Sequence, residues 1–125
     1  MTDYTFKEIL LIKDIKILKK LSYHNNDYVR SGVASNPLCP VDILKILSKD
    51  EHHLVRAYVC SNENCPIEIL ESISDNEINE IVFQYLIFNK NCTLKILKNI
   101  YKKSKDKNVK TNLIKHPNWR FSEFE

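Results

Sequence analysis

Apolar and polar positions recur along most of the chain with a period of 26 to 27 residues. Residues 29–47 read VRSGVASNPLCPVDILKIL, and residues 55–73 read VRAYVCSNENCPIEILESI. A third copy follows 27 positions later, with Phe83 in the arginine column and Thr93 in the proline column. A fourth copy is more divergent, and residues 17–21 match the end of a half repeat that precedes the first copy. Such a period indicates a stack of similar units.

Each unit predicts two short helices. Val29 and Val33 are four residues apart, so both side chains lie on one face of a first helix. Asn36 follows that helix, and asparagine tolerates the left-handed conformation that stops a helix. Pro40 falls at the first position of a second helix, where its missing N–H has no partner to lose. One unit cannot bury its own apolar stripe, whereas stacked units can, which predicts an all-α solenoid.

The repeat predicts one domain for the 125 residues. Thr5 and Glu8 match a capping box ahead of the first helix. The expected divisions are an N-terminal cap or half repeat at 1–20, repeats at 21–46, 47–72 and 73–99, and a C-terminal cap repeat at 100–125.

Composition narrows the possible classes of protein. One glycine and four prolines leave few residues for the turns of a sheet or for a phosphate-cradling loop, so nucleotide-binding folds are nearly excluded. No apolar run approaches the roughly 18–20 residues of a membrane span, and the start of the chain lacks the bases of a signal peptide. We expect a cytoplasmic protein with reduced cysteines and no membrane partner.

The order VR, VA, NP, CP, IL, L in the first copy resembles the leucine-rich repeat variant, a member of the HEAT-like group of helical repeats. The resemblance covers about 100 residues from Leu21 onward, strongly in two copies and weakly in two. It implies a right-handed superhelix of helix pairs, here about four, in which one helix per unit is short or of the 3₁₀ type. The longer period of this chain favours a fuller second helix. Some relatives carry an N-terminal cysteine cluster for an iron–sulfur centre, but no cysteine precedes Cys39, so no cofactor is implied.

Three cysteines, Cys39, Cys65 and Cys92, share one column of successive units. Packed helices lie about 8–10 Å apart, whereas zinc thiolates lie about 2.3 Å from one shared ion. Cys60 and Cys65 are five residues apart, which is not the spacing of a zinc knuckle. We interpret these cysteines as small buried hydrophobic residues and expect no metal site.

Catalysis has little support in the sequence. His52 and His53 are adjacent, so we expect their side chains to point apart, and neither has a carboxylate at a spacing typical of a metal ligand or a general base. We therefore expect no catalytic residue and no enzyme activity.

The arginine column consists of Arg30 and Arg56. The two residues form either a binding row on the concave face or ion pairs inside the stack, with acids such as Asp27 or Glu51. Internal pairing is favoured because Phe83 interrupts the row. The sequence leaves open which helix of each unit lines the concave face.

Residues 81–88, IVFQYLIF, are unusually apolar for one helix of a repeat. Either this helix is buried on several sides, or part of it is an exposed patch that binds a partner or a second copy of the chain. We predict a non-catalytic protein-binding module, of the kind found in small inhibitors or immunity-type proteins. The candidate protein contacts are Tyr28, Arg30, Arg56, Tyr58, Phe83 and Tyr85.

Charge is uneven along the chain, with +3 over residues 1–49, −7 over 50–89 and +7 over 90–125. The basic C-terminal unit predicts an alternative function, contact with the phosphate backbone of a nucleic acid. A purely structural alternative is that these lysines form the solvated outer face of a terminal cap. The residues of this alternative site are Lys102, Lys103, Lys105, Lys107, Lys110, Lys115 and Arg120.

Overall fold

The structure of the chain is a computed structural model that describes residues 4–119. Over this range it contains nine α-helices and no β-strand, which confirms the all-α class. None of these helices combines the length and the hydrophobicity that a membrane-spanning helix needs. The helices are α1 (Phe6–Leu10), α2 (Ile15–Leu21), α3 (Asp27–Ser35), α4 (Val41–Leu47), α5 (His53–Ser61), α6 (Ile67–Asn76), α7 (Glu80–Ile87), α8 (Leu94–Lys103) and α9 (Lys107–Ile114).

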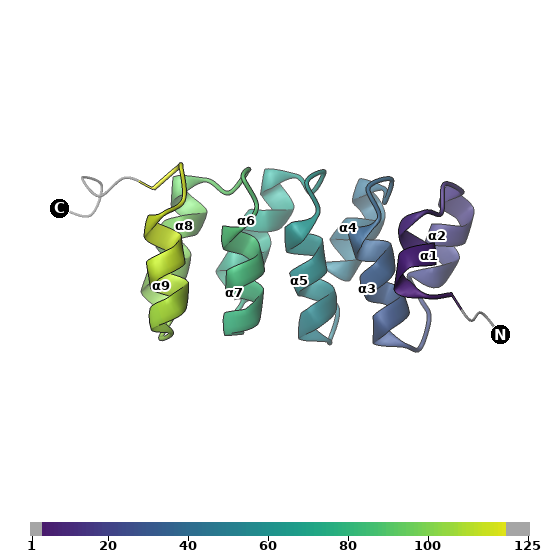
Figure 1. Cartoon of the computed structure of the whole chain (residues 1–125), viewed down its shortest axis with the longest axis horizontal. Helices are drawn as coiled ribbons and strands as arrows, with labels where there is room; N and C mark the ends of the chain where they lie inside the picture. Colours follow the sequence, from purple (N-terminus) through teal and green to yellow (C-terminus); the bar gives the residue numbers. More distant parts are fainter. Residues whose placement is uncertain (1–3, 120–125) are drawn as a thin grey trace.

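The helices form two layers (Figure 1). The odd-numbered helices stand in one row, and α2, α4, α6 and α8 form a second row behind it. Along the first row α1 packs on α3, α3 on α5, α5 on α7 and α7 on α9. The N-terminal helices stand at one end of the row and α9 at the other. Segments one repeat apart in the sequence therefore lie side by side.

The core lies between the two layers and is built from repeated columns. The column of Leu18 on α2 continues through the even-numbered helices, and the column of Val33 on α3 continues through the odd-numbered ones. Each side chain of these columns is 0% exposed, a burial worth about 1.5–3 kcal/mol per side chain. The two columns are Leu18, Leu44, Leu70 and Leu97, and Val33, Val59, Leu86 and Leu113.

The helix starts follow their sequence signals closely. The Thr5 side chain accepts a hydrogen bond from the Glu8 N–H, and Glu8 accepts one from the Thr5 N–H, so the predicted capping box is confirmed. Pro40 and Pro66 are N-caps with extended backbone, one residue before the predicted position. Their fixed φ suits this position, and the Pro40 carbonyl already accepts the bond from Leu44 at 3.0 Å.

The odd-numbered helices do not end in the predicted way. No residue in the described range 4–119 has a positive φ. Asn36 closes α3 with φ −67° and ψ 126°, and Asn62 closes α5 with φ −73° and ψ 119°. The expectation of a left-handed stop was therefore wrong. The chain leaves α3 and α5 through an extended residue, whereas α7 ends at Phe88 in the right-handed helical region. The asparagine side chains serve a different purpose.

Candidate functional site

Buried asparagines connect each unit to the one before it. The Asn36 Nδ2 donates to the carbonyl oxygens of Ile9 and Ile12, at 2.7 and 2.9 Å. The Asn89 Nδ2 makes the equivalent bonds to Cys60 and Asn62, at 2.8 and 3.2 Å. Each side-chain oxygen also accepts a bond from the backbone N–H two residues later. We call this column, Asn36, Asn62, Asn89 and His116, the asparagine ladder.

His116 replaces asparagine in the last unit and makes two of the three equivalent bonds. Its Nδ1 accepts from the Asn118 N–H at 3.0 Å, and its Nε2 lies 3.1 Å from the Asn89 carbonyl oxygen. Because Nδ1 accepts a hydrogen bond, the proton of a neutral ring is on Nε2 and is donated to that carbonyl. The imidazole thus substitutes for both ends of an amide.

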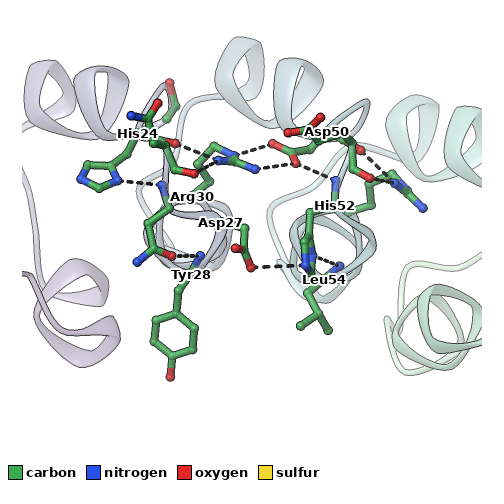
Figure 2. A network of polar contacts seen from close by, with 12 residues as sticks. His24, Asp27, Tyr28, Arg30, Asp50, His52 and Leu54 are labelled. Carbon is green, nitrogen blue, oxygen red and sulfur yellow. Dashed lines mark hydrogen bonds and ion pairs between the residues drawn. The ribbon is translucent and has the colours of Figure 1, made fainter.

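Two arginines form ion pairs inside the stack (Figure 2). Arg30 binds Asp50 in a bidentate pair, with N–O distances of 2.8 and 3.1 Å. Its Nη1 also donates to the carbonyl oxygens of His24 and Asn25. Arg56 repeats this arrangement with Glu77, at 2.7 and 3.0 Å.

The internal pairing of the arginines was expected, but the predicted acids, Asp27 and Glu51, were wrong. Each guanidinium binds the carboxylate of the following link, while the preceding link supplies backbone carbonyls. The side chains of Arg30 and Arg56 are 12% and 22% exposed. Both candidate contacts are therefore held by the fold and do not form a free binding row.

The third unit loses the arginine and its acid together. Phe83 occupies the arginine column and is 0% exposed, so its place among the candidate contacts was wrong. Ser104 occupies the column of Asp50 and Glu77, and its hydroxyl donates to a Glu80 oxygen at 2.6 Å. The pairing of these columns across units indicates a structural role for the arginines.

Burial and hydrogen bonding act in opposite directions on these pairs. Burial would raise the pKa of Glu77, but the hydrogen bonds from Arg56 and from the N–H groups of Asn79 and Ile78 hold it below its ordinary value. Hydrogen bonding to Asp50 raises the pKa of Arg30, and hydrogen bonding to Glu77 raises that of Arg56. The Arg56–Glu77 pair is therefore ionised at neutral pH.

The cysteine column is buried, as the sequence predicted. Cys39, Cys65 and Cys92 are at most 5% exposed and form no disulfide with one another or with Cys60. Burial raises the pKa of each of the three thiols to about 12, so they remain protonated. Cys60 is fully buried, and its pKa is also raised. Neutral thiols in this setting are weak nucleophiles.

We expected the side chains of the two adjacent histidines to point apart, and this prediction was wrong. The His52 and His53 rings stack, with centroids 4.9 Å apart. The His52 Nδ1 accepts from the Leu54 N–H at 3.2 Å and caps α5, while its Nε2 lies 3.4 Å from Asp27. No group of three or more metal-ligating side chains occurs within residues 4–119.

An aromatic row crosses the outer side of the odd-numbered helices. Phe6 packs against Tyr28 and Tyr58, with ring centroids 5.5 and 5.3 Å apart, and Tyr58 packs against Tyr85 at 5.5 Å. Tyr28 points away from the Arg30–Asp50 pair (Figure 2). The structure thus unites three of the candidate contacts. Phe6 was not among them, because it precedes the repeat and has no column to mark it.

Helix α7 is buried on several sides and still exposes one stripe, while the binding of a partner or a second copy by that stripe stays a prediction. Val82, Phe83, Leu86 and Ile87 are in the core. On the opposite side Ile81 is 46% exposed, Phe88 is 72% exposed, and Tyr85 lies half-buried between them. Their spacing of four and three residues places these three side chains on one helix face.

The helix columns that carry or flank the aromatic row are poor in charge. We define the odd face as four columns on four helices of the described chain. Three of its sixteen positions, Ser31, Gly32 and Ala57, are buried, and Lys115 is the single charged residue among the other thirteen. In the whole chain 28% of residues are charged. The odd face consists of Tyr28, Ser31, Gly32 and Ser35; Leu54, Ala57, Tyr58 and Ser61; Ile81, Gln84, Tyr85 and Phe88; and Asn108, Thr111, Asn112 and Lys115.

The C-terminal lysines are divided between structural and exposed positions. The Lys103 Nζ donates to the carbonyl oxygens of Ser74 and Asp75 at the end of α6, both at 2.6 Å. The Lys110 Nζ lies over the Tyr101 ring, 4.9 Å from its centroid. Arg120 lies outside the described residues. The exposed members of the predicted site are Lys102, Lys105, Lys107 and Lys115.

Comparison with known proteins identified no relative of this chain. No family model matches the chain, and neither does a curated protein or a solved structure.

Proposed function

We propose that the chain is a non-catalytic protein-binding module built as a right-handed α-solenoid of about four helix pairs, similar to the leucine-rich repeat variant and other HEAT-like repeats. The side-by-side packing of equivalent helices and the asparagine ladder between units support the solenoid. The cysteines are buried and protonated, and His52 caps a helix, which supports a role without chemistry.

The odd face is the proposed interface, and its depletion of charge is the observation that carries this proposal. Exposed surfaces of a protein this rich in charge normally carry lysines and acids. The cores of protein interfaces are instead depleted in charge and enriched in tyrosine and phenylalanine. Tyr28, Tyr58 and Tyr85 provide large, stiff contact areas of the kind that dominate binding energy. An inhibitor or immunity-type protein that covers a larger target would use such a face.

The experiment uses the chain to capture partner proteins from a lysate of the native host. It compares two matched double variants for the partners that they retain. Tyr28→Arg with Ile81→Arg places two charges on the odd face, where these side chains are 61% and 46% exposed. Ile46→Arg with Ile67→Arg makes the same change on the even-numbered helices, at 47% and 42% exposure. We expect the first pair to lose a partner that the second retains, with unchanged circular dichroism for both. A partner retained by the odd-face variant would reject this interface.

Contact with nucleic acid is the second candidate function, and four exposed lysines around the C-terminal unit favour it. Such binding would fall steeply with added salt, because it depends on counterion release. The test uses a fluorescein-labelled DNA duplex and an RNA strand, and the variant Lys102→Glu, Lys105→Glu, Lys107→Glu. Lys103 stays unchanged because it supports α6. Absence of binding at low salt would remove this function.

A further inference from the structure

A hollow of about 280 Å³ lies between the C-terminal ends of α7 and α9. Ile87, Phe88 and Pro117 give it apolar walls, and Lys90 and Lys115 are its charged residues. Its lining includes no acid. Sites for drug-sized molecules span about 300–1,000 Å³. This hollow therefore suits one large side chain better than a complete small molecule.

Two polar residues of the hollow are already committed to the fold. His116 bonds to the Asn89 carbonyl and the Asn118 N–H, and Asn112 donates to Gln84 at 3.2 Å. They form fixed walls. The groups that remain for a ligand are the apolar surface and the two ammonium groups.

The two lysines lack carboxylate partners in the described chain. Both side chains are exposed, and neither Lys90 nor Lys115 forms an ion pair with a residue in 4–119. Residues 90–125 carry ten basic against three acidic side chains, so this end of the molecule attracts acidic partners. Phe88 belongs to the hollow and to the odd face, so the two surfaces are continuous.

We propose that this hollow anchors an aromatic–acidic segment of the protein partner. One aromatic side chain of the segment enters the apolar hollow, and neighbouring carboxylates pair with Lys90 and Lys115. The rest of the partner continues from Phe88 onto the odd face. This assignment rests on the proposed protein-binding function. It names the chemistry of the partner, because the charges across an interface select complementary partners.

The experiment measures fluorescence anisotropy of the full chain with a fluorescein-labelled peptide, GSDEFEDGS. Control peptides are GSDEAEDGS, which lacks the aromatic ring, and GSNQFQNGS, which lacks the charges; a ten-nucleotide thymidine strand supplies phosphates instead. We expect at least tenfold weaker binding of all three controls. The variant Lys90→Glu, Lys115→Glu should weaken GSDEFEDGS binding at least tenfold. The matched variant Lys16→Glu, Lys19→Glu on α2 should leave it unchanged.

Several outcomes would overturn the assignment. These are no binding of GSDEFEDGS, equal binding of GSDEAEDGS or of the thymidine strand, and equal losses in the two lysine variants. Residues 121–125 of this chain, FSEFE, have the same aromatic–acidic pattern. If Phe121→Ala, Phe124→Ala, which leaves the charge unchanged, raises peptide affinity tenfold, the occupant belongs to the chain itself. If the peptide measurements fail but the Tyr28→Arg, Ile81→Arg variant still loses its partner in lysate capture, this anchor is rejected. The proposed function then remains intact.

Discussion

The side-chain amide of Asn62 donates to the backbone carbonyl oxygen of Asn36, its counterpart one unit earlier, at 3.0 Å. The same nitrogen donates to the Ala34 carbonyl at 2.8 Å. The carbonyl of Asn62 in turn accepts the bond from Asn89. Backbone oxygens at these helix ends are buried away from water, and the ladder supplies a donor to each of them. The Asn36 and Asn62 carbonyls also accept from the Cys39 and Cys65 N–H groups, whereas the ladder bond is the one that reaches across units. Each asparagine therefore joins two units and satisfies groups that would be expensive to leave unpaired.

Replacing Asn62 by alanine should lower the free energy of unfolding by about 2–3 kcal/mol, because two buried carbonyls lose a donor. Urea unfolding followed by circular dichroism measures the change. Glu63→Ala is the control, since Glu63 is the exposed neighbour and should change stability by less than about 0.5 kcal/mol. Equal effects of the two substitutions would show that the ladder adds nothing to stability.

His116 offers a test of the same ladder by restoration. His116→Asn should retain the stability of the unaltered chain, because an amide can make both bonds of the imidazole. His116→Ala should lower the free energy of unfolding by about 1–3 kcal/mol, since it removes both hydrogen bonds of the imidazole. The Asn89 carbonyl then keeps only the bond from the Cys92 N–H at 3.0 Å. Thermal unfolding of the two variants compares them directly. Asparagine as damaging as alanine would contradict this account.

The period of the sequence predicts the helices and the core well, and the reason is geometric. Leu44 and Leu70 share a column in the sequence and a column in the core, since each unit buries the same side chains against its neighbours. Asn62 was misinterpreted because a local rule for ending helices explains an asparagine there equally well. Its actual partners lie 26 and 28 residues earlier, and only the stacked arrangement brings them together.

The sequence contains a signal for the acids that pair with the arginines. The prediction missed it because it chose the acids nearest in sequence to each arginine. Asp50 and Glu77 stand in one column, and that column changes to Ser104 in the same unit in which Phe83 replaces arginine. Comparing columns across units identifies the pairs. The candidate interface was harder to predict, because the exposure of Phe88 and the burial of Phe83 depend on how α7 is surrounded.

Glu77 should stabilise the fold at neutral pH and lose this effect in acid. Its pKa in the folded protein lies below the ordinary value of 4.5, so its contribution is present above that pH and disappears as the pH falls through the folded pKa. Glu77→Gln should lower the free energy of unfolding by about 2 kcal/mol at pH 7, because the pair with Arg56 loses its charge. The difference should shrink steadily below pH 4.5.

Urea unfolding at pH 7, 5, 4 and 3 measures this dependence, with Glu68→Gln as the control. Glu68 is exposed on α6 and forms no ion pair within residues 4–119, so its substitution should have little effect at any of these pH values. A stability difference for Glu77→Gln that is the same at pH 3 and pH 7 would show that charge is not its source.

Gly32 is the single glycine of the chain, and its role is to provide space. Its φ is not positive, and it shares a column with Tyr58 and Tyr85. A Cβ at this position would lie 2.9 Å from Ile9 Cγ2 and 3.0 Å from Ile9 Cβ, closer than side chains tolerate. The missing side chain lets α1 approach α3. Phe6, on α1, is thereby brought into contact with both Tyr28 and Tyr58.

Alanine at Gly32 improves helix propensity by about 1 kcal/mol, while overpacking costs about 1–3 kcal/mol. Ile9 is 0% exposed, and its Cβ is fixed to the backbone of α1, so relief requires the helix to move. We expect Gly32→Ala to destabilise the chain by about 1 kcal/mol and to change the near-ultraviolet circular dichroism of the aromatic row. Adding Ile9→Val removes the Cδ1 that lies 3.1 Å from the new Cβ but retains the Cβ contact, so it should relieve the strain in part. If Gly32→Ala stabilised the protein and left the aromatic signal unchanged, close packing of α1 would not be the reason for glycine here.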